Sequence, residues 1–152
     1  MGGRSQQQPP IAPSGDVVSA GGPCSPADAF ASALGFRVLQ QDRGRAAVEF
    51  IADERHVNDL GVVHGGSLFS LGDAALALAA NDEDEAAIGV AVSIRFLRSA
   101  RAGDRLEAHA QEEYRGRRRG VYSARILCGS ELIALLEGES QVVGPRARPS
   151  AE

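Results

Sequence analysis

One segment of the chain, residues 60–81, holds a single carboxylate in otherwise uncharged surroundings. It reads LGVVHGGSLFSLGDAALALAAN, and apart from His64 its other side chains are apolar, small or uncharged. From about Ser67 to Asn81 the apolar residues lie nearly all round a helix, which predicts a buried helix rather than a surface one. An isolated ionised carboxylate is costly to bury. Asp73 is therefore expected either to be paired, with Arg95 as a candidate partner, or to carry out chemistry.

The two ends of the chain differ in composition from its middle. Residues 1–24 are rich in Gly, Pro, Gln and Ser, and residues 145–152 are similar. Such segments bury too little apolar surface to offset the entropy of ordering them, so we expect two disordered tails. Residues 25–144 are then one domain, long enough for a sizeable core. Ser25-Pro26 has the N-cap and first-turn residues of a short helix that ends near Gly35.

Strand-like patterns fill most of the remaining domain. They cover residues 36–41, 45–51, 86–99, 104–114, 120–128 and 131–143. Apolar and polar side chains alternate in residues 45–51, 86–99, 104–114 and 120–128, as in half-buried strands. In residues 86–99 this alternation predicts that Ile88, Val90, Val92, Ile94 and Phe96 share one face.

Short connections between these strands indicate antiparallel hairpins. Together the patterns predict an α+β fold, an antiparallel sheet wrapped around one long central helix. The acidic run 82–85 is expected to be a solvated loop.

Composition excludes several classes of partner. The net charge is −4, and all 16 basic residues are Arg, which argues against a general nucleic-acid surface. Cys24 and Cys128 lack metal-ligand spacing and suit a reducing cytosol. The N-terminal segment lacks the apolar core of a signal peptide, and the longest apolar run is too short to span a bilayer. We therefore expect a cytoplasmic protein without nucleic-acid or membrane partners.

Polar features gather where the central helix begins. Gly65 and Gly66 have no side chain to shield backbone N–H groups that lack an intrahelical partner, so these groups are suited to stabilise a developing oxyanion. Asp73 lies eight residues beyond Gly65, a rise of about 12 Å along a helix. One reacting carbon cannot be ~3 Å from both groups. Either they serve different ends of a ligand, or a two-fold axis brings Asp73 of one chain to Gly65 of another, which predicts an obligate homodimer.

Several segments together resemble a known family. HGGSLFSLGD at residues 64–73, preceded by Val57-Asn58, is similar to the PaaI-type acyl-CoA thioesterases of the hotdog superfamily. The likeness continues through IRFLR at residues 94–98, AGD at 102–104 and RGR at 115–117, and covers the folded part. Gly72 departs from the pattern, which usually has a small apolar residue such as Ala there. Residues 89–92 lack the hydroxyl that some relatives carry.

The resemblance implies a hotdog fold, dimers that commonly pair into homotetramers, and hydrolysis of acyl-CoA thioesters. By position, Asp73 matches the catalytic carboxylate and Gly65 the backbone donor to the thioester carbonyl. Asn58 and His64 match residues that position water and substrate. Coenzyme A enters only as part of the substrate, so no separate cofactor is expected. Aryl or medium-chain acyl groups are the expected substrates.

Substrate contacts are expected from two further groups of residues. Gly66 and Phe69 lie beside the proposed reaction centre, and Phe69 would contribute to an apolar acyl pocket. The Arg-rich turn around Gly116, together with Arg98, offers guanidinium groups whose shape suits phosphates. Its candidate phosphate contacts are Arg117 and Arg118.

Simpler interpretations of these residues remain open. His64 could only cap the helix, the two glycines could only form a tight turn, and Asn58 could only hold its loop together. His56 and His109 are expected to be solvated. A zinc site of His56, His64 and Asp73 is not expected from their spacing. No nucleophile elbow surrounds Ser67 or Ser70.

The reaction also has alternatives. Asp73 could activate water as a general base, with a pKa raised by its apolar surroundings, or attack directly to give an anhydride. A non-catalytic acyl-CoA-binding or sensing module on the same fold is the main alternative function. A hydratase or dehydratase is a third.

Overall fold

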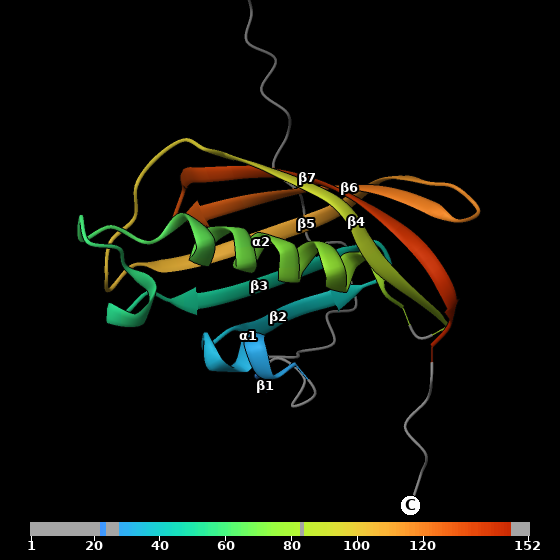
Figure 1. The fold of residues 1–152 in the computed structure, drawn as a ribbon, viewed down its shortest axis with the longest axis horizontal. Coiled ribbons are helices and arrows are strands. Elements are labelled where there is room, and N and C mark those ends of the chain that lie inside the picture. The colour runs from blue at the N-terminus through green and yellow to red at the C-terminus, as the bar shows by residue number, and fades with distance from the viewer. Residues whose placement is uncertain (1–21, 24–27, 83, 147–152) are drawn as a thin grey trace, which may run out of the picture.

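The computed structural model describes residues 22–23, 28–82 and 84–146. A curved seven-stranded antiparallel sheet wraps around one long helix, α2 (Figure 1). The elements in chain order are β1 (Gly22–Pro23), α1 (Ala29–Ala33), β2 (Arg37–Asp42), β3 (Arg45–Ile51), a 3-10 turn (Glu54–His56), α2 (Gly65–Ala80), β4 (Glu85–Phe96), β5 (Arg105–Arg115), β6 (Arg119–Cys128) and β7 (Glu131–Pro145). The strand order is β1-β2-β3-β5-β6-β7-β4, so α2 carries the chain across the sheet from β3 to the far edge. This is the predicted architecture.

The ends of the chain lie largely outside the described residues. That holds for residues 1–21 and 147–152 of the predicted tails and for the predicted helix start at Ser25-Pro26. Within the described part, β1 pairs with β2, and β7 extends to Pro145. Helix α1 has Asp28 as its N-cap, whose carboxylate accepts from the Ala31 N–H at 2.9 Å. None of the described helices is long and apolar enough to cross a membrane.

The alternation predicted for three strands is confirmed. Their inward residues are buried: Ala46, Val48 and Phe50 of β3, Leu106, Ala108 and Ala110 of β5, and Tyr122, Ala124 and Ile126 of β6. The outer face of β3 differs from the expectation, because Ala47 and Glu49 are buried too. Glu49 is only 5% exposed and pairs with Arg37 and Arg105 from the neighbouring strands. Glu49 was expected on the polar face of the strand, and its ion pairs with the two arginines accompany its burial there.

Strand β4 departs from the predicted single apolar face. Irregularities in its pairing with β7 fall between Ala86 and Ala87 and between Gly89 and Ala91. A bulge changes which face the following side chains occupy. Ile88 therefore pairs with Gln141 and is 55% exposed. The predicted shared face of β4 is wrong at Ile88.

Helix α2 begins two residues earlier than predicted, at Gly65, and is buried along only part of its surface. Leu68, Leu71, Ala75 and Ala79 lie in the core under the sheet. A second stripe, made by Gly66, Ser70, Asp73 and Ala77, is exposed or half-buried. The described chain thus leaves one face of the helix uncovered, contrary to the expectation of burial on nearly all sides.

The prediction of a solvated side chain is wrong for His56, and the prediction of a solvated loop at residues 82–85 is wrong for the Asp82 side chain. His56 is 1% exposed: its ring packs on Phe50, its Nδ1 accepts from the Asp53 N–H at 3.0 Å, and its Nε2 lies 2.8 Å from the Leu34 carbonyl. Asp82, at the start of the acidic run, is also sheltered. It lies 3.5 Å from Arg43 and 3.7 Å from Arg115. His109 is partly exposed at the polar face of β5, next to Glu107.

Candidate functional site

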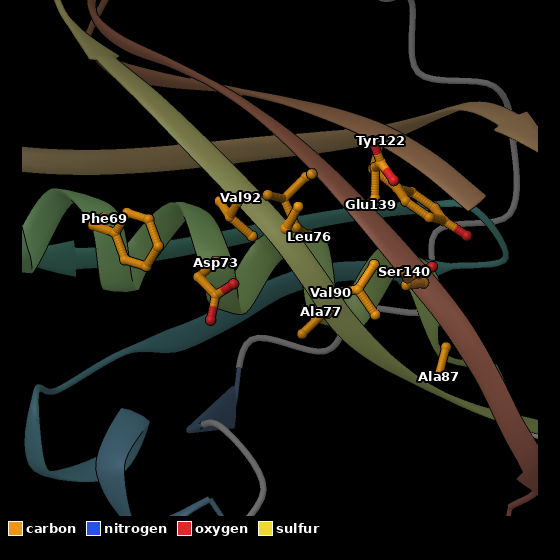
Figure 2. Close-up of a pocket in the computed structure, with 14 residues that line it drawn as sticks. Phe69, Asp73, Leu76, Ala77, Ala87, Val90, Val92, Tyr122, Glu139 and Ser140 are labelled. Carbon is orange, nitrogen blue, oxygen red and sulfur yellow. The ribbon is translucent and has the colours of Figure 1, made fainter. Parts of the chain in front are cut away.

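A cavity of about 360 Å³ opens between the uncovered face of α2 and strand β4, and Asp73 lies in its wall (Figure 2). Its lining is Phe69, Asp73, Leu76, Ala77 and Ala80 of α2, Ala87 and residues 89–92 of β4, and Tyr122, Gly138, Glu139 and Ser140 of β6 and β7. Most of these side chains are apolar. The cavity therefore offers an apolar ligand a binding surface with one carboxylate near Phe69.

Asp73 is half-buried and unpaired. Among the described residues its carboxylate has no hydrogen-bond or ion-pair partner. Arg95 does not pair with it but lies 3.6 Å from Glu137, with both side chains exposed. Partial burial in these apolar surroundings raises the pKa of Asp73 above its ordinary value. A raised pKa is expected of a carboxyl group that takes up a proton during a reaction.

The start of α2 combines a cap with a free donor. The His64 Nδ1 accepts from the Gly66 N–H at 2.8 Å, so His64 caps the helix, as the simpler interpretation had it. That bond removes the Gly66 N–H as an oxyanion donor. The Gly65 N–H has no partner within the described ranges, and the Phe96 ring packs against this residue: a Cβ on Gly65 would lie 3.0 Å from the Phe96 Cζ. Gly65 is thus the better placed of the two donors.

Asn58 is used by its own loop. Its Oδ1 accepts from the Leu60 N–H at 3.0 Å and the Val62 N–H at 3.3 Å. Its backbone also pairs with Val62. The side-chain amide NH₂ keeps both hydrogens unpaired among the residues described. Asn58 therefore shapes the loop before α2, and only its amide nitrogen is available to a ligand.

Gly65 and Asp73 lie on one uninterrupted helix, which keeps them apart within a chain. Helix α2 runs without a break from Gly65 to Ala80. The rise of about 12 Å between the two residues therefore applies. A single chain does not bring the free N–H and the unpaired carboxylate to one reacting carbon. The structure holds one chain, so the pairing across a two-fold axis stays a prediction.

The arginine candidates divide into paired and free groups. Arg98 lies 2.7 Å from Glu131. Arg115 donates to Glu112 at 2.6 Å and lies 3.7 Å from Asp82, which follows the end of α2. Arg117 and Arg118, at the exposed tip of the β5–β6 hairpin, have no ion pair in the described part of the chain. They are the free cations of this hairpin, at the opposite end of α2 from Gly65.

The hairpin tip and the two serines have local roles. The Gly116 N–H donates to the Arg119 carbonyl at 2.7 Å and closes the turn. Ser70 donates to the Gly66 carbonyl at 2.8 Å, and Ser67 to the His56 carbonyl at 3.3 Å. Neither serine hydroxyl is hydrogen-bonded to a histidine side chain, as an activated nucleophile would be.

The residues at the other end of the cavity were not predicted from the sequence. Tyr122 and Ser140 line it at a distance from Phe69 and Asp73 (Figure 2). The alternation in β6 placed Tyr122 inside, but only the pairing of β6 with β7 shows which wall it forms. The sequence carried a signal for its burial and none for its place in the cavity.

The sequence of the chain is similar to those of known proteins. Residues 60–134 match the sequence model of the thioesterase superfamily. The acyl-coenzyme A thioesterase PaaI of Escherichia coli is 40% identical over 118 residues, which are 77% of this chain and 84% of that protein.

Solved structures of similar proteins have the same fold as this chain. The PaaI protein from the phenylacetic acid degradation operon of E. coli superimposes with a TM-score of 0.75 at 39% identity, over 78% of this chain and 86% of that one. The TT0310 protein of Thermus thermophilus gives a TM-score of 0.72 at 35% identity, over 74% and 95%. The chain belongs to the thioesterase superfamily, as a PaaI-type member with the hotdog fold.

Proposed function

We propose that the protein hydrolyses acyl-CoA thioesters with aryl or medium-chain acyl groups to the free acid and CoA. The half-buried carboxylate of Asp73, which has no partner among the described residues and lies in the wall of a mainly apolar cavity, carries this proposal. It occupies the position of the catalytic carboxylate in the PaaI-type pattern. The E. coli relative named as an acyl-coenzyme A thioesterase supports the substrate class.

In the proposed reaction, Asp73 acts as a general base toward water. The carboxylate takes one proton from the water as its oxygen adds to the thioester carbonyl carbon. The Gly65 N–H of a second chain donates to the resulting oxyanion, where the dipole of α2 also favours negative charge. The intermediate collapses with cleavage of the C–S bond, and Asp73 returns the proton to the departing thiolate. A raised pKa suits both transfers.

The site requires at least a homodimer, and we expect a homotetramer. The CoA phosphates would lie near Arg117 and Arg118 of a second chain, because the cavity beside Asp73 runs toward the hairpin of its own chain. Among the described residues, these two arginines are the cations of the hairpin without an ion pair. The Phe69 side chain and the Gly66 backbone would contact the acyl group and the thioester.

The experiment is thiol release from a panel of aryl and straight-chain acyl-CoA esters. We expect release by the unaltered protein and a loss of about a hundredfold or more in kcat for Asp73→Asn. Asp42→Asn is the matched control, because Asp42 lies exposed at the end of β2 and, within the described part of the chain, its side chain accepts a hydrogen bond only from Gln40. Binding of every ester without thiol release would overturn the proposal in favour of a sensing module.

A single turnover in ¹⁸O-water separates the two roles of Asp73. A general base leaves the label only in the released acid. Incorporation of the label into Asp73 would show direct attack through an anhydride.

A further inference from the structure

The cavity has a definite far end. From Asp73 it follows α2 for seven residues to Ala80, about 10 Å. Ala77 and Ala87 flank this stretch with small side chains, so the space remains open. Figure 2 shows Phe69 and Asp73 at one end and Tyr122 at the other. The Tyr122 side chain, 3% exposed, is part of the lining at that end.

Contacts on several sides hold the Tyr122 ring in place. Its hydroxyl donates to the Glu112 Oε2 at 3.2 Å and accepts from the Arg115 Nη2 at 3.4 Å. Gly120 gives the ring its room, because a Cβ there would lie 2.6 Å from the Tyr122 Cε2. Arg115 also reaches Asp82, just after the end of α2. The ring is thus tied both to the hairpin and to the region beyond the helix.

The groups behind the ring are charged. Glu112 and Arg115 form an ion pair at 2.6 Å, and both are largely sheltered from solvent. An apolar chain that displaced the ring would meet this pair and disturb its hydrogen bonds, which is costly. The cavity is thus lined mainly by apolar side chains from Phe69 onward, and polar groups gather at its Tyr122 end, where Glu139 and Ser140 also line it.

We propose that the Tyr122 ring is the end wall of the acyl pocket and sets the upper limit on acyl length. This inference rests on the proposed function, since it takes the occupant of the cavity to be the acyl group of the thioester cleaved at Asp73. An apolar cavity with a reactive carboxylate at one end and a fixed aromatic wall at the other accepts acyl groups up to the length that reaches the ring. A longer acyl group would either leave part of its chain outside the cavity or press against the Tyr122 ring, which costs free energy.

The test is kcat/KM for straight-chain acyl-CoA esters from butanoyl to tetradecanoyl. The unaltered protein is expected to lose efficiency beyond a medium length. Tyr122→Leu should raise the ratio of long-chain to short-chain kcat/KM by roughly tenfold or more. Tyr122→Phe keeps the ring and should keep the preference. Ala87→Leu narrows the cavity from β4 and should shift the preference the other way, to shorter chains.

Tyr114→Leu is the matched control, because Tyr114 lies on the same hairpin, is exposed and does not line the cavity. Circular dichroism tests whether each variant is folded. If Tyr122→Leu does not fold, the chain-length profile of Ala87→Leu alone tests the inference. Thiol release with the same length profile in Tyr122→Leu and Ala87→Leu as in the unaltered protein would overturn the inference and leave the proposed function intact. It would indicate that a second copy of the chain fills the cavity. No release from any ester by the unaltered protein would overturn both.

Discussion

Among the described residues Asp73 has no ion-pair or hydrogen-bond partner, and its partly apolar surroundings make its ionisation unfavourable in the folded chain. Burial raises the pKa of Asp73 in the folded protein, whereas the unfolded chain keeps an ordinary aspartate. The folded state therefore binds the proton more tightly. Its stability is greatest when Asp73 is protonated and falls as the pH rises through the raised pKa.

This linkage predicts how Asp73→Asn affects stability. At a pH below the ordinary aspartate range (about 3.9) the variant and the unaltered protein should unfold at similar temperatures. As the pH rises from there through the raised pKa toward neutrality, the variant should become the more stable of the two, because it has no charge to bury. Thermal unfolding monitored by circular dichroism across this pH range measures the difference. A variant markedly less stable at neutral pH would instead indicate a structural partner for Asp73.

Asp53 provides a control with the opposite sign. Side-chain hydrogen bonds from Arg55 hold the pKa of Asp53 well below its usual range. Its contribution to stability is therefore present above the ordinary aspartate pKa and is lost as the pH falls. Asp53→Asn should be no more stable than the unaltered protein at neutral pH, whereas Asp73→Asn should be more stable.

At the scale of elements, the contact between α2 and the sheet depends on a missing side chain. A Cβ on Gly72 would lie 2.4 Å from the Leu136 Cδ2, and Leu136 is fully buried on β7. The departure from the PaaI-type pattern at residue 72 therefore has a local reason, because a leucine occupies the space that an alanine would need.

Gly72→Ala should therefore destabilise the protein. Alanine favours the helix by roughly 0.5–1 kcal/mol, but overpacking a core costs about 1–3 kcal/mol, so a net loss of about 1 kcal/mol is expected. Leu136→Val in the same chain should recover part of it. Urea unfolding measures both. Gly89→Ala is the control, since nothing lies within 4 Å of the Cβ it would add. An equal or higher stability of Gly72→Ala would show that Leu136 moves aside freely.

The β5–β6 hairpin leads to a prediction about substrate binding. Arg117→Ala combined with Arg118→Ala should raise KM for acyl-CoA several-fold, with little change in kcat, because two cations facing the phosphates are lost. The same variant should cleave an acyl-pantetheine thioester, which lacks the nucleotide phosphates, as well as the unaltered protein does. Arg125→Ala removes a charge from the outer face of β6 and is the control. Equal effects on both substrates would exclude a phosphate contact.

Local patterns predicted most elements, whereas contacts distant in sequence decided the exceptions. The alternation in β3, β5 and β6 identified their inward faces because each pairs regularly with its neighbour. The bulges of β4 have no comparable signal. His56 was expected to be solvated because its partner Leu34 lies 22 residues away. The isolation of Asp73 was visible in the sequence, but the cavity beside it exists only once β4 crosses the helix.

At the scale of the whole molecule, the single chain leaves its site open on one side. In the part of the chain that the structure describes, the stripe of α2 that carries Asp73 is exposed or half-buried, and β4 is the edge strand of the sheet. Val90 and Phe96 on this strand are large and exposed. An apolar edge strand beside an uncovered helix face is the kind of surface that a second copy covers. The two-fold arrangement proposed for the site would use this surface.

Subunit mixing tests whether each site combines two chains. Gly65→Pro deletes the proposed N–H donor at the first helical position, where proline is favoured, and His64 at φ −61° and ψ 137° already has a conformation suited to precede proline. Gly65→Ala adds a Cβ against Phe96 but keeps the N–H, so it is the matched control. Gly65→Pro alone should lose about 10²–10³ in kcat. Asp73→Asn alone should be inactive as well.

After subunit exchange between these two inactive variants, half of the dimers are mixed, and each mixed dimer has one site with both groups intact. Roughly a quarter of the unaltered activity should therefore return. If Gly65 and Asp73 of the same chain acted together, every site in the mixture would lack one of them. Activity would then stay at the level of the separate variants, and the composite site would be excluded.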